Sequence, residues 1–280
     1  MAAAAKFHMA GVMGWPVLHS RSPLLHNHWL GRHGLAGVYV PLEIKVENLG
    51  AALRALPALG FAGCNLTLPH KIEALALVDS VDPVGTRIGA INCVAVRSGG
   101  KLDGFNFDAW GFVESVAERH PSWKAGAGPA VVLGAGGGAR AIVDGLLQRG
   151  AKEVRVVNRT LARASELRER FGSAIVPVAW DDRGRALDGA AMLVNTTTQG
   201  MTGQAPLDIA LDALPKTALV ADIVYVPLET PLLAAARARG NPAVDGLGML
   251  LHQARPAFQA WFGVLPEVTP ELRAKIEATL

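Results

Sequence analysis

Cysteine is scarce in this chain of 280 residues, which contains only Cys64 and Cys93. Two cysteines in separate apolar segments exclude a disulfide framework and favour a reducing compartment, so we predict that both are inert core thiols. The chain also lacks any run of about 18 apolar residues, which excludes a membrane-spanning helix. Residues 1–14 contain no basic stretch followed by an apolar run long enough for export, and we therefore expect a cytoplasmic protein.

Charge is low as well: charged residues make up 18% of the chain, and the formal net charge is +3. There is no cluster of Lys and Arg, which argues against a nucleic-acid partner and leaves at most a weak attraction for anionic ligands. His26, His28 and His33 lie close together, but their spacing fits no single helix face and they have no matching acidic or Cys partner, so we expect no metal site. The sequence leaves the oligomeric state open between a monomer and a homodimer.

Hydrophobic residues make up half of the chain, and its length exceeds the usual size of one domain, so we expect two. In the first half, strand-like and helical segments alternate, which is typical of an α/β fold with a mostly parallel sheet. We expect Ser22 to be the N-cap of the first helix, with Pro23 at its first position. The expected strands are residues 7–13, 38–44, 63–68 and 90–96, the expected helices are 22–34, 49–56 and 71–78, and 98–104 is a hairpin-like turn.

A turn-rich segment at residues 118–129 precedes a second α/β unit. Thr230 and Pro231 are the expected N-cap and first residue of one of its helices, and Pro256 should kink or end another. The expected strands are residues 130–133, 153–157, 174–178, 191–195 and 218–224. The expected helices are 138–149, 161–170 and 230–240, followed by two more within 246–263 and 269–280.

The segment "AVVLGAGGGARAIVDGLL" supplies a buried strand, a glycine turn and a helix in the order of a dinucleotide-binding motif. Gly134 permits the tight turn, Gly136 lets the backbone approach a pyrophosphate, and Ala139 lets the helix pack closely on the strand. The phosphates would bind N–H groups at the positive end of the helix. We predict a Rossmann-type site whose turn comprises Gly134, Ala135, Gly136, Gly137, Gly138 and Ala139.

The segment after the next strand, "VVNRTLAR", indicates which dinucleotide binds. An NAD site carries an Asp or Glu there for the ribose 2′-hydroxyl, and this chain has none. Arg159 and Arg163 are four residues apart, and two guanidinium groups beside Asn158 and Thr160 suit a 2′-phosphate. A solvated arginine face is the alternative interpretation. We predict NADP(H) as the cofactor.

Two short polar segments, "SRSPLLH" at residues 20–26 and "NLTLPHK" at residues 65–71, stand out in the apolar first half. We interpret them as ligand-binding segments for a small polyhydroxylated acid. With them in place, the whole chain resembles the shikimate dehydrogenase family, because family motifs follow in order over almost its full length. The matching segments are "GWPVLHSRSP", "NLTLPHK", "GAIN", "FNFDAWG", "VLGAGGGAR", "NRTLAR", "NTTTQGM", "DIVYVPLETPLL" and "DGLGMLLHQA".

The resemblance implies NADP-dependent interconversion of 3-dehydroshikimate and shikimate, in aromatic amino-acid biosynthesis. It implies a substrate domain at 1–107 and 246–280, with a C-terminal helical pair that folds back onto it, and a Rossmann dinucleotide domain at 108–245. By the same resemblance, Ser20 and Ser22 hold the substrate carboxylate. The remaining substrate-binding residues are Asn65, Thr67, Asn92, Tyr225 and Gln253, and Ile223 and Gly246 lie at the nicotinamide.

Lys71 and Asp108 match the catalytic pair of the family. Hydride transfer to a ketone builds negative charge on oxygen, so a cation or proton donor must lie within hydrogen-bonding reach. Lys71 would supply it, and Asp108 would hold the ammonium group and share the proton. Taken singly, Lys71 also fits a surface lysine, and Asp108 fits a helix cap.

Two positions depart from the family pattern. Phe107 replaces the usual Thr beside Asp108, and Val226 replaces the usual Asn after Tyr225. Because both changes fall near the expected pocket, an alternative is a paralogue that acts on quinate or a related cyclohexane carboxylic acid. A second alternative is a non-catalytic NADP-sensing protein, although such a protein would not need the pair Lys71 and Asp108.

Overall fold

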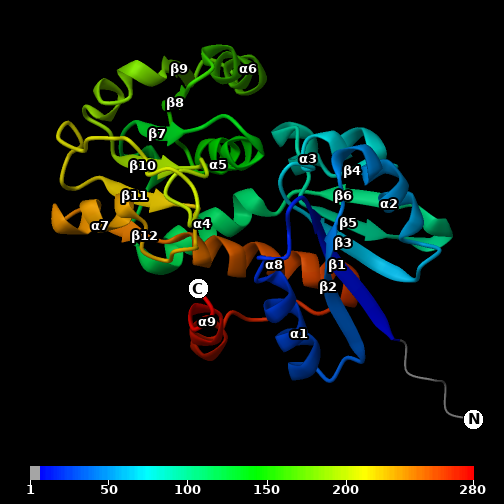
Figure 1. Cartoon of the computed structure of the whole chain (residues 1–280). Helices are drawn as coiled ribbons and strands as arrows, with labels where there is room; N and C mark the ends of the chain where they lie inside the picture. The colour runs from blue at the N-terminus through cyan, green and yellow to red at the C-terminus, as the bar shows by residue number, and fades with distance from the viewer. Residues whose placement is uncertain (1–6) are drawn as a thin grey trace, which may run out of the picture. The chain divides into compact units, whose positions relative to one another are not determined.

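The computed structural model describes residues 7–280, and the chain divides into two compact units (Figure 1). Unit 1 contains the residues up to Phe107 together with Leu251–Thr279, and unit 2 contains Asp108–Leu250 and Leu280. Helix α8 (Gly246–Phe262) crosses this boundary, since its first turn groups with unit 2 and the rest with unit 1.

The sheet of unit 1 has six strands in the order β2-β1-β3-β5-β6-β4. Strand β1 pairs in parallel with β2 and β3, whereas β5 runs antiparallel to β3 and β6. The strands are β1 (His8–Gly14), β2 (Gly37–Glu43), β3 (Phe61–Leu66), β4 (Ser80–Val81), β5 (Cys93–Val96) and β6 (Leu102–Phe105). The helices are α1 (Ser22–Arg32), α2 (Leu49–Ala55), α3 (Pro83–Ile88) and α9 (Pro270–Glu277), with 3-10 turns at Val46–Asn48, Glu73–Leu77 and Ser98–Gly100.

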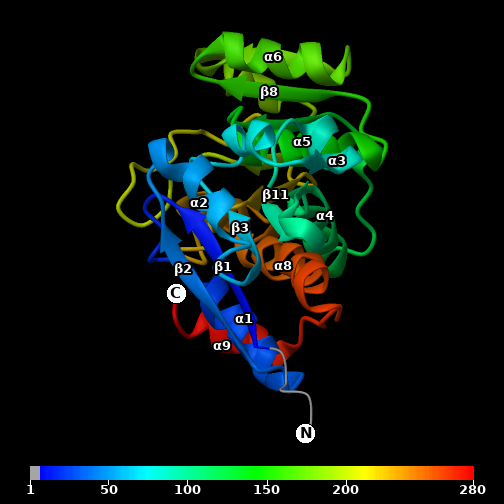
Figure 2. The same cartoon turned by 90° about the vertical axis from the view of Figure 1, so that its right-hand side faces the viewer.

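The C-terminal helices complete unit 1. Figures 1 and 2 show α9 beside α1, although the two helices come from opposite ends of the chain. The indole nitrogen of Trp29 on α1 donates to the carbonyl of Glu267 at 3.1 Å, and that of Trp261 on α8 donates to the carbonyl of Val94 on β5 at 2.9 Å. Because both tryptophan side chains are buried, these bonds satisfy polar atoms that water cannot reach.

Unit 2 has an entirely parallel sheet in the order β12-β11-β10-β7-β8-β9. Helix α5 is buried along most of its length, α4 packs against it, and α6 lies along β8 and β9 (Figure 2). The strands are β7 (Ala130–Leu133), β8 (Val154–Asn158), β9 (Ile175–Ala179), β10 (Met192–Asn195), β11 (Leu219–Asp222) and β12 (Ala243–Val244). The helices are α4 (Asp108–Arg119), α5 (Gly137–Gln148), α6 (Leu161–Phe171) and α7 (Pro231–Ala238), with 3-10 turns at Ala125–Ala127, Trp180–Asp182 and Arg185–Leu187.

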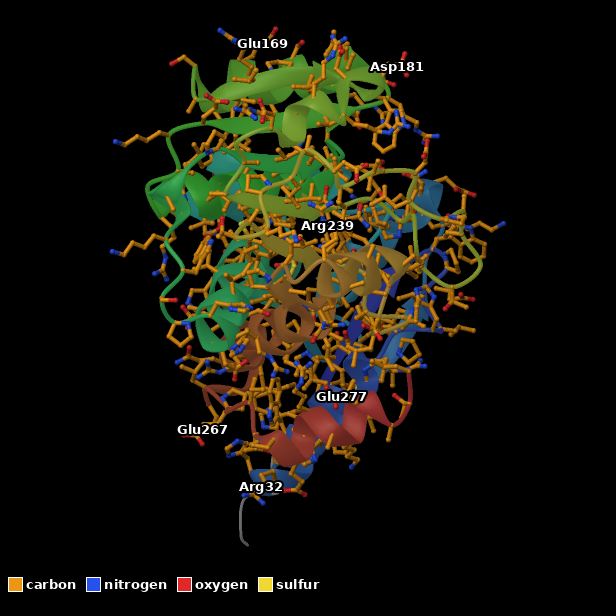
Figure 3. All side chains as sticks on the ribbon, turned by 90° about the vertical axis from the view of Figure 1, so that its left-hand side faces the viewer. Arg32, Glu169, Asp181, Arg239, Glu267 and Glu277 are labelled. Carbon is orange, nitrogen blue, oxygen red and sulfur yellow. The ribbon has the colours of Figure 1, made fainter. Side chains whose placement is uncertain are left out.

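The predicted α/β class is confirmed by these two mostly parallel sheets. Four of the five strands of unit 2 that the sequence predicts, β7, β8, β10 and β11, are largely buried, and they read in the sequence as short apolar runs. Many charged side chains lie at the surface, and those of Glu169 and Asp181 point away from the sheet of unit 2 (Figure 3). No helix within residues 7–280 is both long and apolar enough to cross a membrane.

Two local predictions were wrong, and a third was wrong in part. Arg21 rather than Ser22 is the N-cap of α1, and Ser22 is its first residue. The segment predicted as a helix at 71–78 forms only the 3-10 turn Glu73–Leu77. Of the two outcomes predicted for Pro256, a kink or an early end, the early end is wrong: helix α8 continues to Phe262, and Ala257 and Phe258 beyond the proline are completely buried.

The two cysteines lie in the sheet of unit 1, as predicted. Both are free and completely buried, and burial raises the pKa of the Cys64 and Cys93 thiols. A buried thiol with a raised pKa forms little thiolate at neutral pH, so neither cysteine is a nucleophile here.

Candidate active site

The carboxyl ends of β1 and β3 form the first part of the candidate site. The chain leaves β1 to form β2 on one side and returns to form β3 on the other, and ligands bind at such a switch point in α/β sheets. The loops after these strands are tied together, because Trp15 N–H donates to the carbonyl of Leu68 at 3.1 Å. The side chain of Thr67 fills the space beside Gly14, where no Cβ could be accommodated. The loop that leads to the first polar segment therefore lies beside the second polar segment at one edge of the sheet.

Ser20 and Ser22 stand at the start of α1. The hydroxyl oxygen of Ser20 accepts a hydrogen bond from the backbone N–H of Ser22 at 3.2 Å, so Ser20 caps the helix from outside. The side chain of Ser22 is buried, whereas Ser20 is half-buried. The two hydroxyls thus lie at the positive end of a helix, which is suited to a carboxylate.

A chain of buried polar side chains crosses the middle of unit 1. The Tyr39 hydroxyl donates to Oδ1 of Asn65 at 2.7 Å, and Nδ2 of Asn65 donates to the carbonyl of Asn92 at 3.0 Å. The Asn92 side chain in turn donates to Oε1 of Gln253 on α8 at 3.1 Å. Oδ1 of Asn92 accepts from the backbone N–H of Phe107 at 2.9 Å. Three of the predicted substrate-binding residues, Asn65, Asn92 and Gln253, are therefore brought together although 161 positions separate the last two.

Tyr39 was missed by the sequence reasoning. It lies in β2, is 1% exposed and fixes which way the Asn65 amide points. Burial raises the pKa of Tyr39, so its hydroxyl remains protonated and acts as a donor. The signal in the sequence is weak, because a tyrosine in an apolar strand reads as core.

The predicted catalytic residues belong to different units. Lys71 is half-buried in unit 1, and its carbonyl accepts from the N–H of Ile91 at 2.8 Å, which brings its backbone next to the residue before Asn92. Asp108 is the first residue of α4 in unit 2 and is 3% exposed. Tyr225, predicted to contact the substrate, is a half-buried residue of unit 2.

The glycine turn lies between β7 and α5. Gly134 adopts a φ of +103°, and a Cβ there would lie 2.8 Å from Oγ1 of Thr196, so only glycine fits. Gly136 has ordinary backbone angles, and a Cβ there would meet no atom within 4 Å. Gly136 is the N-cap of α5 and has no side chain to cap the first N–H groups of the helix. The protein itself does not demand glycine at 136, and the open backbone there fits the close approach predicted for a pyrophosphate.

The segment after β8 lies beside the glycine turn, because Gly134 N–H donates to the carbonyl of Val157 at 2.8 Å. Asn158 donates to the carbonyl of Thr160 at 2.8 Å and so shapes the turn into α6. Arg159, Thr160 and Arg163 are exposed. The residues present fit a 2′-phosphorylated ribose, since two exposed guanidinium groups follow the strand and residues 158–165 contain no carboxylate.

Ile223 and Gly246 also gather at the carboxyl edge of unit 2. A Cβ on Gly138 would lie 3.1 Å from Cδ1 of Ile223, so the side chain of Ile223 lies against the first turn of α5. Gly246 packs so closely on the carbonyl of Ile223 that no Cβ fits between them. The predicted cofactor residues of three separate segments are thus neighbours.

A second buried polar cluster was also missed. Asn195 and Asp222 end the adjacent strands β10 and β11, both are almost fully buried, and Nδ2 of Asn195 donates to Oδ1 of Asp222 at 3.0 Å. Burial raises the pKa of Asp222 to about 6, against the effect of its hydrogen bonds. The signal was available, because each strand is apolar except for its last residue. Within the described part of the chain, no group of three His, Cys, Asp or Glu side chains is placed to hold a metal ion.

Known proteins resemble this chain over both units. Residues 12–94 match the family model described as the shikimate dehydrogenase substrate binding domain, and residues 116–224 match the one described as shikimate/quinate 5-dehydrogenase. The protein from Paramagnetospirillum magneticum named shikimate dehydrogenase (NADP(+)) is 54% identical over 269 residues, or 96% of this chain and 98% of the relative. The protein of the same name from Rhodospirillum rubrum is 56% identical over 275 residues and 97% of each chain.

Solved structures show the same architecture. Shikimate 5-dehydrogenase from Thermus thermophilus, in complex with NADP(H) and shikimate, has a TM-score of 0.86 and 38% identity, with 98% of this chain and 100% of that chain covered. Quinate dehydrogenase from Corynebacterium glutamicum, in complex with NAD, has a TM-score of 0.87 and 30% identity, with 98% and 99% covered.

Proposed function

Since this chain belongs to the shikimate dehydrogenase family, we propose that it catalyses the reversible NADP-dependent reduction of 3-dehydroshikimate to shikimate. The observation that carries this proposal is that relatives more than half identical over almost their whole length are named shikimate dehydrogenase (NADP(+)). Those names agree with the cofactor predicted from Arg159 and Arg163. They also speak against a non-catalytic NADP sensor.

Unit 1 would bind the substrate. The hydroxyls of Ser20 and Ser22 at the start of α1 would hold the carboxylate, and the amides of Asn65, Asn92 and Gln253 would bind the ring hydroxyls. The polar chain supports this role, because its amides are oriented by hydrogen bonds before any ligand arrives. Amides held in this way bind with a smaller entropy cost than mobile ones.

Unit 2 would bind the dinucleotide, which supplies the hydride when bound. The first turn of α5 would hold the pyrophosphate, and Arg159 and Arg163 would bind the 2′-phosphate. Ile223 and Gly246 would lie against the nicotinamide. The open space at Gly136 and the exposed guanidinium groups support this assignment.

Lys71 would protonate or stabilise the oxygen on which charge develops, and Asp108 would hold its ammonium group. A positioned acid/base group contributes about 10²- to 10⁴-fold to the rate. Lys71→Ala should therefore lower kcat for shikimate oxidation by about 10²-fold or more while the Kd for NADP⁺ changes less than about twofold. Lys101→Ala, at an exposed position on the β5–β6 hairpin, is the matched control and should keep wild-type kcat. Turnover that survives in Lys71→Ala would show that Lys71 is not the acid/base group.

A second candidate substrate is quinate. The ring of Phe107 stacks on Phe105 with centroids 5.6 Å apart, and its backbone N–H binds the side chain of Asn92, so a bulky residue stands where the family has Thr. The test is kcat/KM for shikimate and for quinate, each with NADP⁺ and NAD⁺, in wild type and in Phe107→Thr. We expect shikimate with NADP⁺ to be the best pair, and equal or higher efficiency with quinate would overturn that assignment.

A further inference from the structure

The last residues of β10 and β11, Asn195 and Asp222, are register partners in the parallel sheet of unit 2. Asn195 is 0% exposed and Asp222 is 2% exposed. Asn195 is also the register partner of Leu133, which ends β7 directly before the glycine turn. The pair therefore stands at the edge of the sheet where the residues assigned to the cofactor gather.

The carboxylate of Asp222 fixes both ends of the loop that follows β11. Its Oδ1 accepts from the N–H of Val224 at 3.0 Å, and its Oδ2 accepts from the hydroxyl of Thr230 at 2.8 Å. Thr230 is the N-cap of α7, and its hydroxyl oxygen accepts in turn from the N–H of Leu233 at 3.3 Å. The side chain of Asp222 thus holds both the start and the end of the loop that carries Ile223 and Tyr225, the two predicted ligand contacts.

The amide of Asn195 does the same for the loop after β10. Its Oδ1 accepts from the N–H and the hydroxyl of Thr197 at 3.0 and 2.7 Å, and its Nδ2 donates to the carbonyl of Gln199 at 3.1 Å as well as to Asp222. The backbone carbonyl of Asn195 accepts from the N–H of Ile223 at 3.1 Å. The neighbouring Thr196 bonds the carbonyl of Leu133 through its hydroxyl at 2.5 Å. The pair therefore joins the two loops, and the neighbouring Thr196 joins them to the residue before the glycine turn.

From this geometry we propose that Asp222 and Asn195 are positioning residues, which hold Ile223 and its loop against the first turn of α5 so that the nicotinamide half of the dinucleotide is bound in a fixed place. The proposal deepens the proposed function and rests on it for the identity of the ligand. Neither residue is expected to contact the reacting atoms. Their role is to set the position of Ile223, whose Cδ1 lies 3.1 Å from the place of a Cβ on Gly138.

The carboxylate of Asp222 is costly to bury, because an uncharged side chain in its place would lose less solvation. The groups that face the carboxylate of Asp222 from β10, from its own loop and from α7 are Asn195, the N–H of Val224 and Thr230, none of which carries a charge. Burial accordingly raises the pKa of Asp222 to about 6. An Asn at 222 would keep the bonds from Val224 and Asn195, but its amide nitrogen could not accept the proton of Thr230. Only a carboxylate accepts all three.

The test compares NADP⁺ with 2′,5′-ADP, which carries the 2′-phosphate but lacks the nicotinamide. Calorimetry would give the Kd of each in wild type, in Asp222→Asn and in Thr230→Val, with Thr230→Ser as the conservative variant and Asp212→Asn, at a highly exposed surface position, as the control. We expect the Kd for NADP⁺ to rise about tenfold in Asp222→Asn and Thr230→Val, the Kd for 2′,5′-ADP to stay within about twofold, and both controls to behave as wild type.

A kinetic measurement adds a second readout. In the same two variants we expect kcat for shikimate oxidation to fall by about tenfold to a hundredfold, because a displacement of about 1 Å at the reacting centre has effects of that size. If both ligands lose affinity equally, or if neither does, the positioning role is wrong. If wild-type protein turns over neither shikimate nor quinate, the proposed function fails, while the comparison of the two ligands still decides the role of Asp222. Should Asp222→Asn fail to fold, Thr230→Val against Thr230→Ser gives the same decision.

Discussion

His26 is completely buried in unit 1, and we predict that replacing it with Leu removes an acid-sensitive contribution to stability. Its ring stacks on Tyr39 with centroids 4.2 Å apart and meets Trp29 edge-on at 5.6 Å. Neither ring nitrogen makes a well-formed hydrogen bond within the described residues, although the Asn65 side chain lies near enough to act on the ring. Burial lowers the pKa of His26 from 6.5 to about 3, and the opposing effect of the Asn65 side chain is smaller.

The sign and the magnitude follow from proton linkage. Below pH 6.5 the unfolded chain binds a proton at this histidine, and the folded protein does not until about pH 3, so stability falls as the pH falls through this window. Between pH 7 and pH 5 this one group lowers the free energy of unfolding by about 2 kcal/mol, and its full effect below pH 3 is about 5 kcal/mol.

At pH 7 the substitution has two opposing effects. It removes a buried N–H without a well-formed hydrogen bond, and since such a group lowers stability by about 1–3 kcal/mol, its removal is stabilising. It also removes ring stacking that stabilises the protein by about 0.5–1.5 kcal/mol. His26→Leu should therefore be as stable as wild type at pH 7 or more stable. At pH 5 it should be more stable by a further ~2 kcal/mol.

The assay is denaturant unfolding at pH 7 and pH 5, followed by tryptophan fluorescence. His33→Gln, at an exposed position directly after α1, is the control and should keep the wild-type dependence on pH. If wild type and His26→Leu lose the same free energy of unfolding between pH 7 and pH 5, His26 is not a buried neutral histidine and the reasoning fails.

The glycine turn and the arginine pair give the remaining predictions. Gly134→Ala should lower the stability of unit 2 by about 1–3 kcal/mol, seen as a lower midpoint in thermal unfolding, because φ is +103° and Thr196 lies in the way. Gly136→Ala should change stability by less than about 0.5 kcal/mol but weaken NADP⁺ binding, because its Cβ would meet no protein atom within 4 Å but would occupy the space that we assign to the pyrophosphate. A stable Gly134→Ala, or a Gly136→Ala with wild-type Kd, contradicts the respective account. Arg163→Ala should raise KM for NADPH about tenfold or more and leave KM for NADH unchanged, since it would remove the proposed charge-assisted bond to the 2′-phosphate. Equal rises for both cofactors would assign Arg163 to another part of the dinucleotide.

Local structure was predictable from the sequence where one apolar run makes one strand. The strand predicted at 130–133 is β7, and Thr230 caps α7 through Leu233 as expected, because both depend on residues next to each other in the chain. Helix α3 was missed although its ends are marked: Asp82 accepts from the N–H of Gly85 at 2.7 Å, and Gly89 closes the helix with a φ of +70°. It is only six residues long, too short for helical periodicity to be visible.

Long-range polar contacts were not predictable in the same way. Asn92 and Gln253 meet because α8 packs on the sheet of unit 1, and nothing near either residue in the sequence indicates the other. The resemblance to a family supplied both residues. It did not supply Tyr39, whose hydroxyl orients Asn65, because that contact depends on the register of β2 beside β1 and β3.

One physical rule would have found more of the site. In parallel sheets the ligand-binding residues follow the carboxyl ends of strands, and a strand that is apolar up to a polar last residue brings a polar side chain to that edge. The segments "MLVN" and "LVAD" in unit 2 both have this form, and they end in Asn195 and Asp222. A buried polar residue must be paired, so two such endings on adjacent strands predict a pair. Hydrophobic periodicity alone predicts the strands. The polar residue that ends each apolar run shows which edge of the sheet binds the ligand.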